Sequence, residues 1–254
     1  MMAWRDKLDR FLAGFEHAQD IVGILVCGSY VTGHPTAHSD LDVHLVLDDR
    51  VGYRERGDKI VDGLLIEYFA NPPRQIRAYF EGDLEDRSLM SQTQFATGEI
   101  LLDTDGTVLQ LKRTALAMID SYYQNEAAFM PEPVKYGLWN MLDDLQDAYE
   151  TGRPDFDFLY FNLLDLLVSD YLRCINRPYH LKAIYGHITS DITRKKYLLR
   201  ELPDAPVNAL IARCIAAAHR DEKMASFQSL TEAVLQKFGG FEIDGFQQKS
   251  DVEI

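Results

Sequence analysis

Two aspartates, Asp40 and Asp42, have the type and spacing of metal ligands in this sequence. They stand at the start of the apolar run 41–47, which is typical of a buried strand. Residues i and i+2 of a strand point to the same side, so both carboxylates can bind the same divalent cation. Neighbouring carboxylates raise each other's pKa unless a cation neutralises them, and Mg²⁺ bound to carboxylates and substrate phosphates is a common neutraliser. The pair therefore predicts a magnesium site, for which Mn²⁺ is an alternative metal.

A Gly-Ser pair stands about ten residues before the aspartates. Gly28 and Ser29 follow the apolar run 21–27, which predicts another buried strand. Glycine permits a close approach of the backbone, and serine offers a hydroxyl and an N–H where the strand ends. We therefore expect this pair to bind the phosphates of a nucleotide beside the metal.

The two motifs together, Gly28-Ser29 and Ser39-Asp40-Leu41-Asp42, resemble the signature of the nucleotidyltransferase superfamily. This superfamily includes DNA polymerase beta and the aminoglycoside nucleotidyltransferases, and the resemblance is strongest over about residues 20–70. It implies a catalytic domain in which a third metal-binding carboxylate comes from a later strand.

One acid in the sequence suits that third position. Asp62-Gly63 is a strong hairpin signal, and Glu67 lies inside the β-rich run 64–69 that follows it. A charge within an apolar strand is costly unless it is paired or bound to metal. We expect Glu67 to complete the metal site with the two aspartates, the alternative being a solvated glutamate on an edge strand.

The elements that must position these residues fall into two groups, which predict an α+β fold. A nucleotidyltransferase domain over 1–106, with a small mixed sheet flanked by helices, precedes a helical bundle over 107–240 and a tail over 241–254. In the first domain, alternating and apolar patterns predict strands at 21–27, 41–47, 53–61, 64–69 and 99–102, and helices at 3–19, 75–80 and 88–97. In the second, they predict helices at 107–123, 133–150, 156–175, 190–201, 206–220 and 223–238.

This order of domains resembles the antibiotic-modifying branch of the superfamily, such as the kanamycin and streptomycin/spectinomycin adenylyltransferases. In such enzymes the bundle closes over the active site. Some relatives complete the site across a dimer, so a homodimer is possible here, but the sequence does not fix the oligomeric state. The segment 180–183 resembles the place where the streptomycin/spectinomycin enzymes carry a phosphate-contacting lysine. Lys182 is therefore the candidate for that contact, with a solvated surface lysine as the alternative.

The charge of the chain limits its partners. Forty acidic against 26 basic residues leave a formal net charge of −14, which repels long nucleic acids and favours a small cationic acceptor. No run approaches the roughly 18 apolar residues of a membrane span, and we expect a cytoplasmic protein. The three cysteines, Cys27, Cys174 and Cys214, fit neither a disulfide framework nor a zinc pattern. We expect all three to be reduced and buried.

The residue that accepts the acceptor's proton stays open at this point. It is either one of the metal ligands or a separate acid, and the separate candidates are Glu99, Asp143, Asp144 and Asp147. The last three cluster opposite an apolar stripe of the helix 133–150, an arrangement equally typical of a solvated helix face.

Three histidines lie near the motifs. His44 shares the predicted strand face of Asp42, where we expect a hydrogen-bonded structural role, and His34 and His38 belong to the loop that forms the rim. None of the three is needed as a metal ligand.

The sequence thus predicts a Mg²⁺-dependent nucleotidyltransferase that moves AMP from ATP to a hydroxyl of a small molecule and releases pyrophosphate. The resemblance implies an aminoglycoside-like acceptor and a role in antibiotic resistance. Two other classes are open: an enzyme that modifies a protein partner, and a non-catalytic nucleotide-binding regulator. The large helical domain argues against the first, and the intact carboxylates argue against the second.

Overall fold

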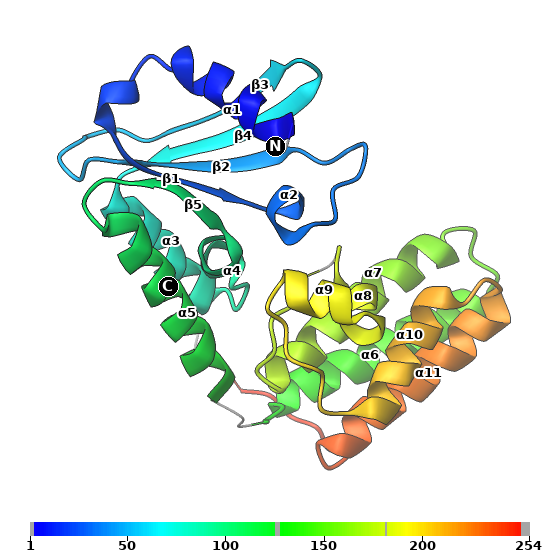
Figure 1. The fold of residues 1–254 in the computed structure, drawn as a ribbon. Helices are drawn as coiled ribbons and strands as arrows, with labels where there is room; N and C mark the ends of the chain where they lie inside the picture. Colours follow the sequence, from blue (N-terminus) through cyan, green and yellow to red (C-terminus); the bar gives the residue numbers. More distant parts are fainter. Residues whose placement is uncertain (1–2, 125–127, 181, 250–254) are drawn as a thin grey trace. The chain divides into compact units, whose positions relative to one another are not determined.

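The computed structural model describes residues 3–124, 128–180 and 182–249, and it divides into two compact units (Figure 1). The first unit comprises Met1–Gln124 with Ile192–Leu199, and the second comprises Asn125–Asp191 with Arg200–Ile254. The first contains a five-stranded mixed sheet with helices and the second is helical. The α+β class predicted from the sequence is confirmed.

The sheet has the strand order β3-β4-β2-β1-β5. Strands β2 and β4 are parallel, and the other neighbouring pairs are antiparallel. Asp62 and Gly63, with φ of 47° and 79°, form the two-residue turn between β3 and β4, which the Asp-Gly signal predicts. The strands are β1 (Ile21–Cys27), β2 (Leu41–Leu47), β3 (Glu55–Val61), β4 (Leu64–Asn71) and β5 (Glu99–Asp103).

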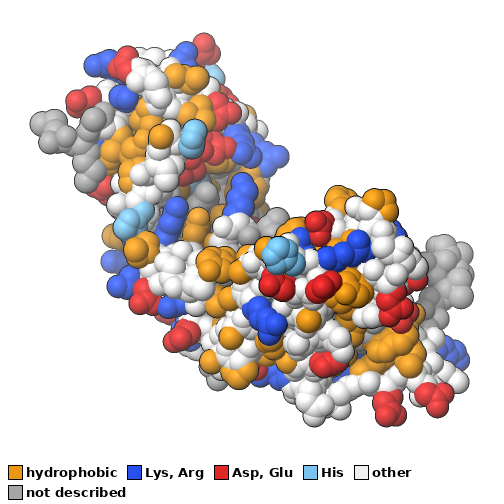
Figure 2. All heavy atoms as spheres, turned by 90° about the vertical axis from the view of Figure 1, so that its right-hand side faces the viewer, with side chains coloured by type: hydrophobic (Ala, Val, Ile, Leu, Met, Phe, Trp, Pro, Cys, Tyr) orange, Lys and Arg blue, Asp and Glu red, His pale blue; other side chains and the backbone are white. Residues whose placement is uncertain are grey.

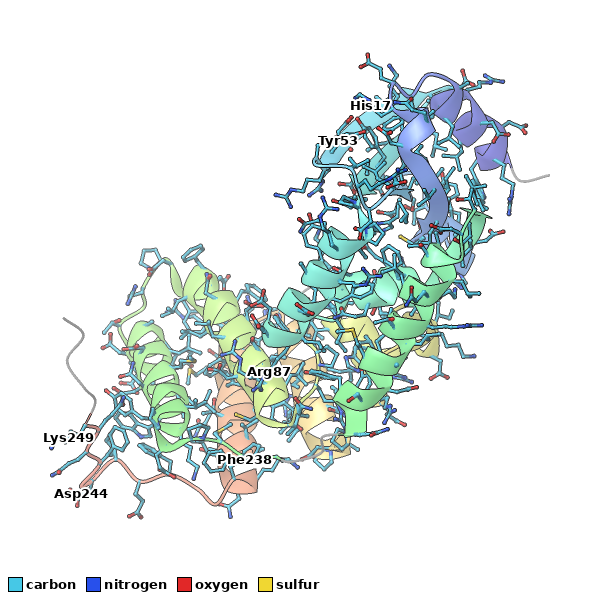
Figure 3. All side chains as sticks on the ribbon, turned by 90° about the vertical axis from the view of Figure 1, so that its left-hand side faces the viewer. His17, Tyr53, Arg87, Phe238, Asp244 and Lys249 are labelled. Atoms are coloured by element: carbon cyan, nitrogen blue, oxygen red, sulfur yellow. The ribbon has the colours of Figure 1, made fainter. Side chains whose placement is uncertain are left out.

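One face of the sheet is covered by helix α1 (Ala3–Ala13). Its buried residues share a hydrophobic core with the strand residues that point to this side, among them Val26 and Val43. The helix was predicted to reach residue 19 but ends before Gly14, a residue type that favours helix C-termini. Beyond it, the ring of His17 lies 5.2 Å from that of Tyr53, and both residues are labelled in Figure 3.

The opposite face carries α3 (Pro73–Glu85), α4 (Met90–Thr97) and α5 (Thr107–Gln124). Helix α5 packs so closely on β1 that a Cβ added at Gly23 would lie 2.0 Å from Cγ2 of Val108. The compact unit therefore extends to Gln124, whereas the predicted domain boundary stood at 106/107. Helical periodicity identified this helix but could not show which elements its apolar face packs against.

The second unit is a helical bundle whose core includes Leu138, Leu167 and Phe227. Its helices are α6 (Glu132–Glu150), α7 (Phe156–Cys174), α8 (Ile184–Thr189), α10 (Ala205–Ala216) and α11 (Arg220–Lys237). The single helix predicted at 190–201 is wrong in its extent. Helix α9 (Asp191–Lys196), which belongs to the first unit from Ile192 on, is shorter, because Leu198 has a φ of 50°, which a continuing α-helix does not allow.

The segment after α11 packs on the second unit. The ring of Phe246 stacks on that of Tyr136 of α6, with 4.8 Å between their centroids, and Phe238, Asp244 and Lys249 of this end of the chain are labelled in Figure 3. The predicted tail is thus docked as far as it is described, and its last residues, 250–254, lie outside the described residues. Among the described helices, none combines the length and apolarity that crossing a membrane requires.

Candidate functional site

Asp40, Asp42 and Glu67, called the triad below, meet at one edge of the sheet. Asp40 precedes β2, Asp42 is its second residue, and Glu67 is the direct neighbour of Asp42 on the parallel strand β4. One carboxylate oxygen from each residue lies within 4.8 Å of the other two, and all three residues are half-buried. Three oxygen donors this close fit a hard divalent cation such as Mg²⁺.

Alternation along β2 produces this arrangement. Leu41 and Val43 are fully buried in the core beneath α1, as the strand pattern predicts. Asp42 therefore faces the opposite side, where its cross-strand neighbours are Glu67 on β4 and Cys27 on β1. The parallel pairing of β2 with β4 places Glu67 beside Asp42. The third carboxylate therefore comes from a strand that is later in the sequence than β2 but next to it in the sheet.

The triad concentrates negative charge that the surrounding residues offset only in part. Burial, followed by the charges of Asp40 and Glu67, raises the pKa of Asp42 to about 6, while Lys196 lowers it. Burial and the three carboxylates also raise the pKa of the Cys27 thiol well above its ordinary value, so this buried, free cysteine stays protonated. A bound cation would relieve this repulsion.

The Gly-Ser motif lies directly against the triad. Gly28 has a φ of 76°, and a Cβ added there would lie 2.1 Å from Oδ2 of Asp42. Only glycine lets the backbone come this close to the carboxylate at this φ. Ser29, nearly buried, begins the single-turn helix α2 (Ser29–Thr32), which ends at Gly33. The Gly-Ser motif and the aspartate motif, which are separate in the sequence, are therefore in contact in the structure.

A pocket of about 340 Å³, called the triad pocket, opens at this point within the first unit. Helix α4 forms part of its wall, and the hydroxyl of Thr93 on that helix donates to the carbonyl oxygen of Tyr197 at 3.5 Å. This bond ties the segment after α9 to α4. The wall residues that can contact a phosphate or a metal include Gly28, Ser29, Asp40, Asp42, Gln94 and Lys196.

Lys196 is the functional candidate that the sequence analysis missed. It lines the triad pocket, and its charge acts on Asp42. A signal was present, because Lys196 ends the basic run 194–196 in a chain whose net charge is −14. Lys182, which the resemblance favoured, is exposed in the turn before α8 and belongs to the second unit. Its contact with a nucleotide stays a prediction.

Of the separate acids proposed as the base, only Glu99 belongs to the unit that contains the triad pocket. Glu99 pairs with Val26 across β5 and β1, and its carboxylate accepts a hydrogen bond from Arg5 of α1. Glu99 therefore faces the α1 side of the sheet, opposite the triad. The three other candidates are exposed on α6 in the second unit, as a solvated helix face would be: Asp143, Asp144 and Asp147.

The three histidines occupy different surroundings. His38 lines the triad pocket, whereas His34 is exposed in the same loop. His44 shares the sheet face of Asp42, as expected, and its ring is buried against Phe69 with 5.1 Å between ring centroids. Burial lowers the pKa of His44 to about 4, and a hydrogen bond with Gln94 opposes this shift. Its Nε2 has no hydrogen-bond partner among the described residues.

Comparisons with known proteins add a distant structural likeness. No family model matches the chain, and no curated protein matches it. One solved structure that matches is that of a nucleotidyltransferase-like protein from Exiguobacterium sibiricum 255-15. It has 11% sequence identity and a TM-score of 0.43, and the match covers 92% of this chain and 74% of that chain. The chain is thus distantly similar to a nucleotidyltransferase-like protein and carries a candidate acidic site of its own.

Proposed function

We propose that the chain transfers a nucleoside monophosphate from a nucleoside triphosphate, ATP in the first instance, to a hydroxyl of a small acceptor and releases pyrophosphate. One observation carries the proposal: the oxygens of Asp40, Asp42 and Glu67 lie within 4.8 Å of one another, and the backbone of Gly28 lies against Asp42. This arrangement combines a site for a hard cation with a glycine whose lack of a side chain lets the end of β1 lie directly against that site.

The triad and the polar residues of the adjoining pocket each have a role in this reaction. Asp40, Asp42 and Glu67 would hold Mg²⁺ or Mn²⁺, which neutralises charge on the phosphates and acts as a Lewis acid. Ser29 and Lys196 lie in the same pocket and would contact the triphosphate, the serine by hydrogen bonds and the lysine by its charge. The chain's own contribution is to hold the α-phosphorus at a fixed place beside the triad.

The chemical step then needs the acceptor hydroxyl to be positioned against the α-phosphorus, and a group that accepts its proton. The acceptor oxygen forms a bond to the α-phosphorus while the bond from that phosphorus to the pyrophosphate oxygen breaks. The hydroxyl proton would pass to a carboxylate of the triad, because Glu99, the one separate candidate in the first unit, faces the other side of the sheet. The preference for one nucleotide would depend on contacts to its nucleobase. The choice of acceptor would depend on the pocket beside the triad.

The direct test is to incubate the purified protein with each nucleoside triphosphate, Mg²⁺ or Mn²⁺ and a panel of acceptors. The panel would contain aminoglycosides, sugars, sugar phosphates and hydroxy acids, with whole-cell protein as a separate arm. Pyrophosphate release together with a gain of one nucleotide mass on an acceptor would support the proposal. Absence of metal-dependent triphosphate binding, measured by calorimetry, together with absence of any product would overturn it.

A further inference from the structure

A second pocket lies on the same face of the sheet as the triad and within the same unit. Its volume is about 440 Å³, and its wall comes from β2, β3, β4, α3, α4 and the residues before β3. We call it the arginine pocket after the two guanidinium groups in its wall. The residues that matter here are His44, Arg54, Arg56, Phe69, Tyr79 and Gln94.

Two residues connect the arginine pocket with the triad and its pocket. Gln94 of α4 lines both pockets. Arg56 of β3 donates a hydrogen bond to the carboxylate of Glu67, and Arg56 itself lines the arginine pocket. A molecule in this pocket would therefore lie beside Glu67, while a nucleotide in the triad pocket would lie beside Asp42.

The wall of this pocket contains two arginines and one glutamate, in a chain whose net charge is −14. Arg54 and Arg56 are both exposed, and each lies over an aromatic ring: Arg56 is 4.9 Å from the centroid of Phe69, and Arg54 is 6.0 Å from that of Tyr79. Glu55 also lines the pocket, but its carboxylate accepts a hydrogen bond from the hydroxyl of Tyr68, which packs against the core on the α1 side. Figure 2 shows Lys and Arg side chains interspersed with Asp and Glu side chains on the face that it draws.

A buried polar atom in the wall lacks a partner. The His44 side chain is nine-tenths buried, and its Nε2 has no hydrogen-bond partner among the described residues. An imidazole nitrogen can donate or accept a hydrogen bond, and leaving it unmade inside a protein is costly. Because His44 lines the arginine pocket, this unpaired polar atom belongs to a wall residue of that pocket.

We propose that the arginine pocket binds the acceptor of the transfer reaction, and that this acceptor carries a carboxylate or phosphate group in addition to its hydroxyl. That the ligand is the acceptor rests on the proposed function, but the preference of the pocket for anions can be measured without any turnover. Guanidinium groups bind both anions through paired N–H donors, so the two share one recognition chemistry. The anionic acceptor replaces the cationic acceptor that the net charge of the chain favoured.

The experiment compares four ligands built on one sugar, in the presence of Mg²⁺: glucose 6-phosphate, glucuronate, glucose and glucosamine. Their dissociation constants would be measured by NMR titration. We expect one or both anions to bind about tenfold more tightly than glucose, the effect of one charge-assisted contact, and glucosamine to bind most weakly. The phosphate and carboxylate arms show which anion the pocket prefers.

Variants locate the binding. The double variant Arg54→Gln/Arg56→Gln should lose the anion preference, because both side chains are exposed and their replacement leaves the core intact. Arg77→Gln is the matched control, since Arg77 is an exposed arginine of α3 outside the pocket wall. Lys196→Gln, which alters the triad pocket, should also leave the preference unchanged.

Three results would overturn the inference: glucosamine binding as tightly as the anions, no measurable binding of either anion, or an equal loss of affinity in Arg77→Gln. Metal-dependent triphosphate binding, measured in the same samples, separates this outcome from failure of the proposed function. Anion binding without triphosphate binding would reject the transferase while keeping the pocket's ligand class. Triphosphate binding without anion preference would do the reverse.

Discussion

The two faces of the sheet treat acidic side chains in opposite ways. On the α1 face, Glu99 is half-exposed and forms an ion pair with Arg5. On the other face, three carboxylates crowd within 4.8 Å, and Arg56 pairs with only one of them, Glu67. Asp40 and Asp42 form no ion pair among the described residues. The first face neutralises its acid within the fold, whereas the second leaves charge that a cation would neutralise.

This difference shows which carboxylates lower the stability of the folded protein: those of the triad, which repel one another. Removing a charge from a repelling group relieves the folded state, while removing one partner of an ion pair does not. Removing the charge of Asp40 or Asp42 should therefore cost activity without costing stability. Removing the charge of Glu99 should lower stability slightly and leave activity unchanged.

The largest effect is expected for Asp42→Asn. The amide cannot neutralise a cation, so transfer should fall at least about a thousandfold, as expected when several kcal/mol of metal-mediated stabilisation is lost. The free energy of unfolding without metal should stay the same or rise. Pyrophosphate release, Mg²⁺ calorimetry and urea unfolding would measure the three quantities.

The matched control for this variant is Asp48→Asn. Asp48 follows β2 and forms an ion pair with Arg50, outside both pockets. It should retain transfer. Near wild-type turnover in Asp42→Asn would remove the triad from the mechanism.

The next effect distinguishes close approach from backbone strain. Gly28 and Gly33 both have positive φ, at 76° and 86°, but only a Cβ at Gly28 meets a carboxylate, while nothing lies within 4 Å of a Cβ at Gly33. Alanine at either position should cost about 1 kcal/mol of unfolding free energy. Gly28→Ala should in addition displace Asp42 and lower transfer about a hundredfold.

Steady-state kinetics and urea unfolding of the two alanine variants would test this comparison. Equal activity in both variants would show that the contact between Gly28 and Asp42 has no functional role. Such a result would leave backbone strain as the whole effect.

A smaller effect is expected for Lys196→Gln. Loss of one charge-assisted contact to the triphosphate should raise the KM for nucleotide about tenfold. Lys195→Gln is the neighbouring control, because Lys195 is exposed and outside the triad pocket. Lys182→Gln tests the residue that the family resemblance favours, and a larger KM effect there would assign the phosphate contact to the second unit instead.

The pH dependence of stability follows from the same repulsion. The pKa of Asp42 is about 6 in the folded protein against 3.8 for the free side chain. Between these values the folded state binds more protons than the unfolded state, so the free energy of unfolding should fall as pH rises from about 4 to 6. Urea unfolding of the wild type and Asp42→Asn in EDTA would isolate this contribution, and saturating Mg²⁺ should cancel it. An identical pH profile for the two proteins would contradict the raised pKa.

The sequence was informative wherever a local pattern carries the information. Asp40 and Asp42 follow from spacing, the turn at Asp62-Gly63 follows from residue type, and the location of Glu67 follows from a charge in an apolar run. Each of these signals lies within a few residues of the feature it predicts.

What the sequence could not supply depends on contacts between distant segments. Lys196 joins the triad pocket because the segment 192–199 packs with α4 of the first unit, about a hundred residues earlier in the chain. Glu99 was a candidate base until strand register placed it beside Val26 and α1 placed Arg5 within reach. Arg54 precedes the edge strand β3 and Arg56 lies on it, and neither stands out in the sequence, because α3 and α4 are what enclose the space beside them. No periodicity encodes such pairings.

The smallest effect is expected for Glu99→Gln, and it tests the other side of the comparison. The Arg5–Glu99 pair is about 40% exposed at each side chain, so its loss should lower the unfolding free energy by less than about 1 kcal/mol. Because the carboxylate points to the α1 face, transfer should be unchanged at every pH. Pyrophosphate release across a pH series and urea unfolding would measure both. A large loss of transfer with an altered pH profile would make Glu99 the proton acceptor, and its side chain would then have to leave Arg5 and reach the triad during the reaction.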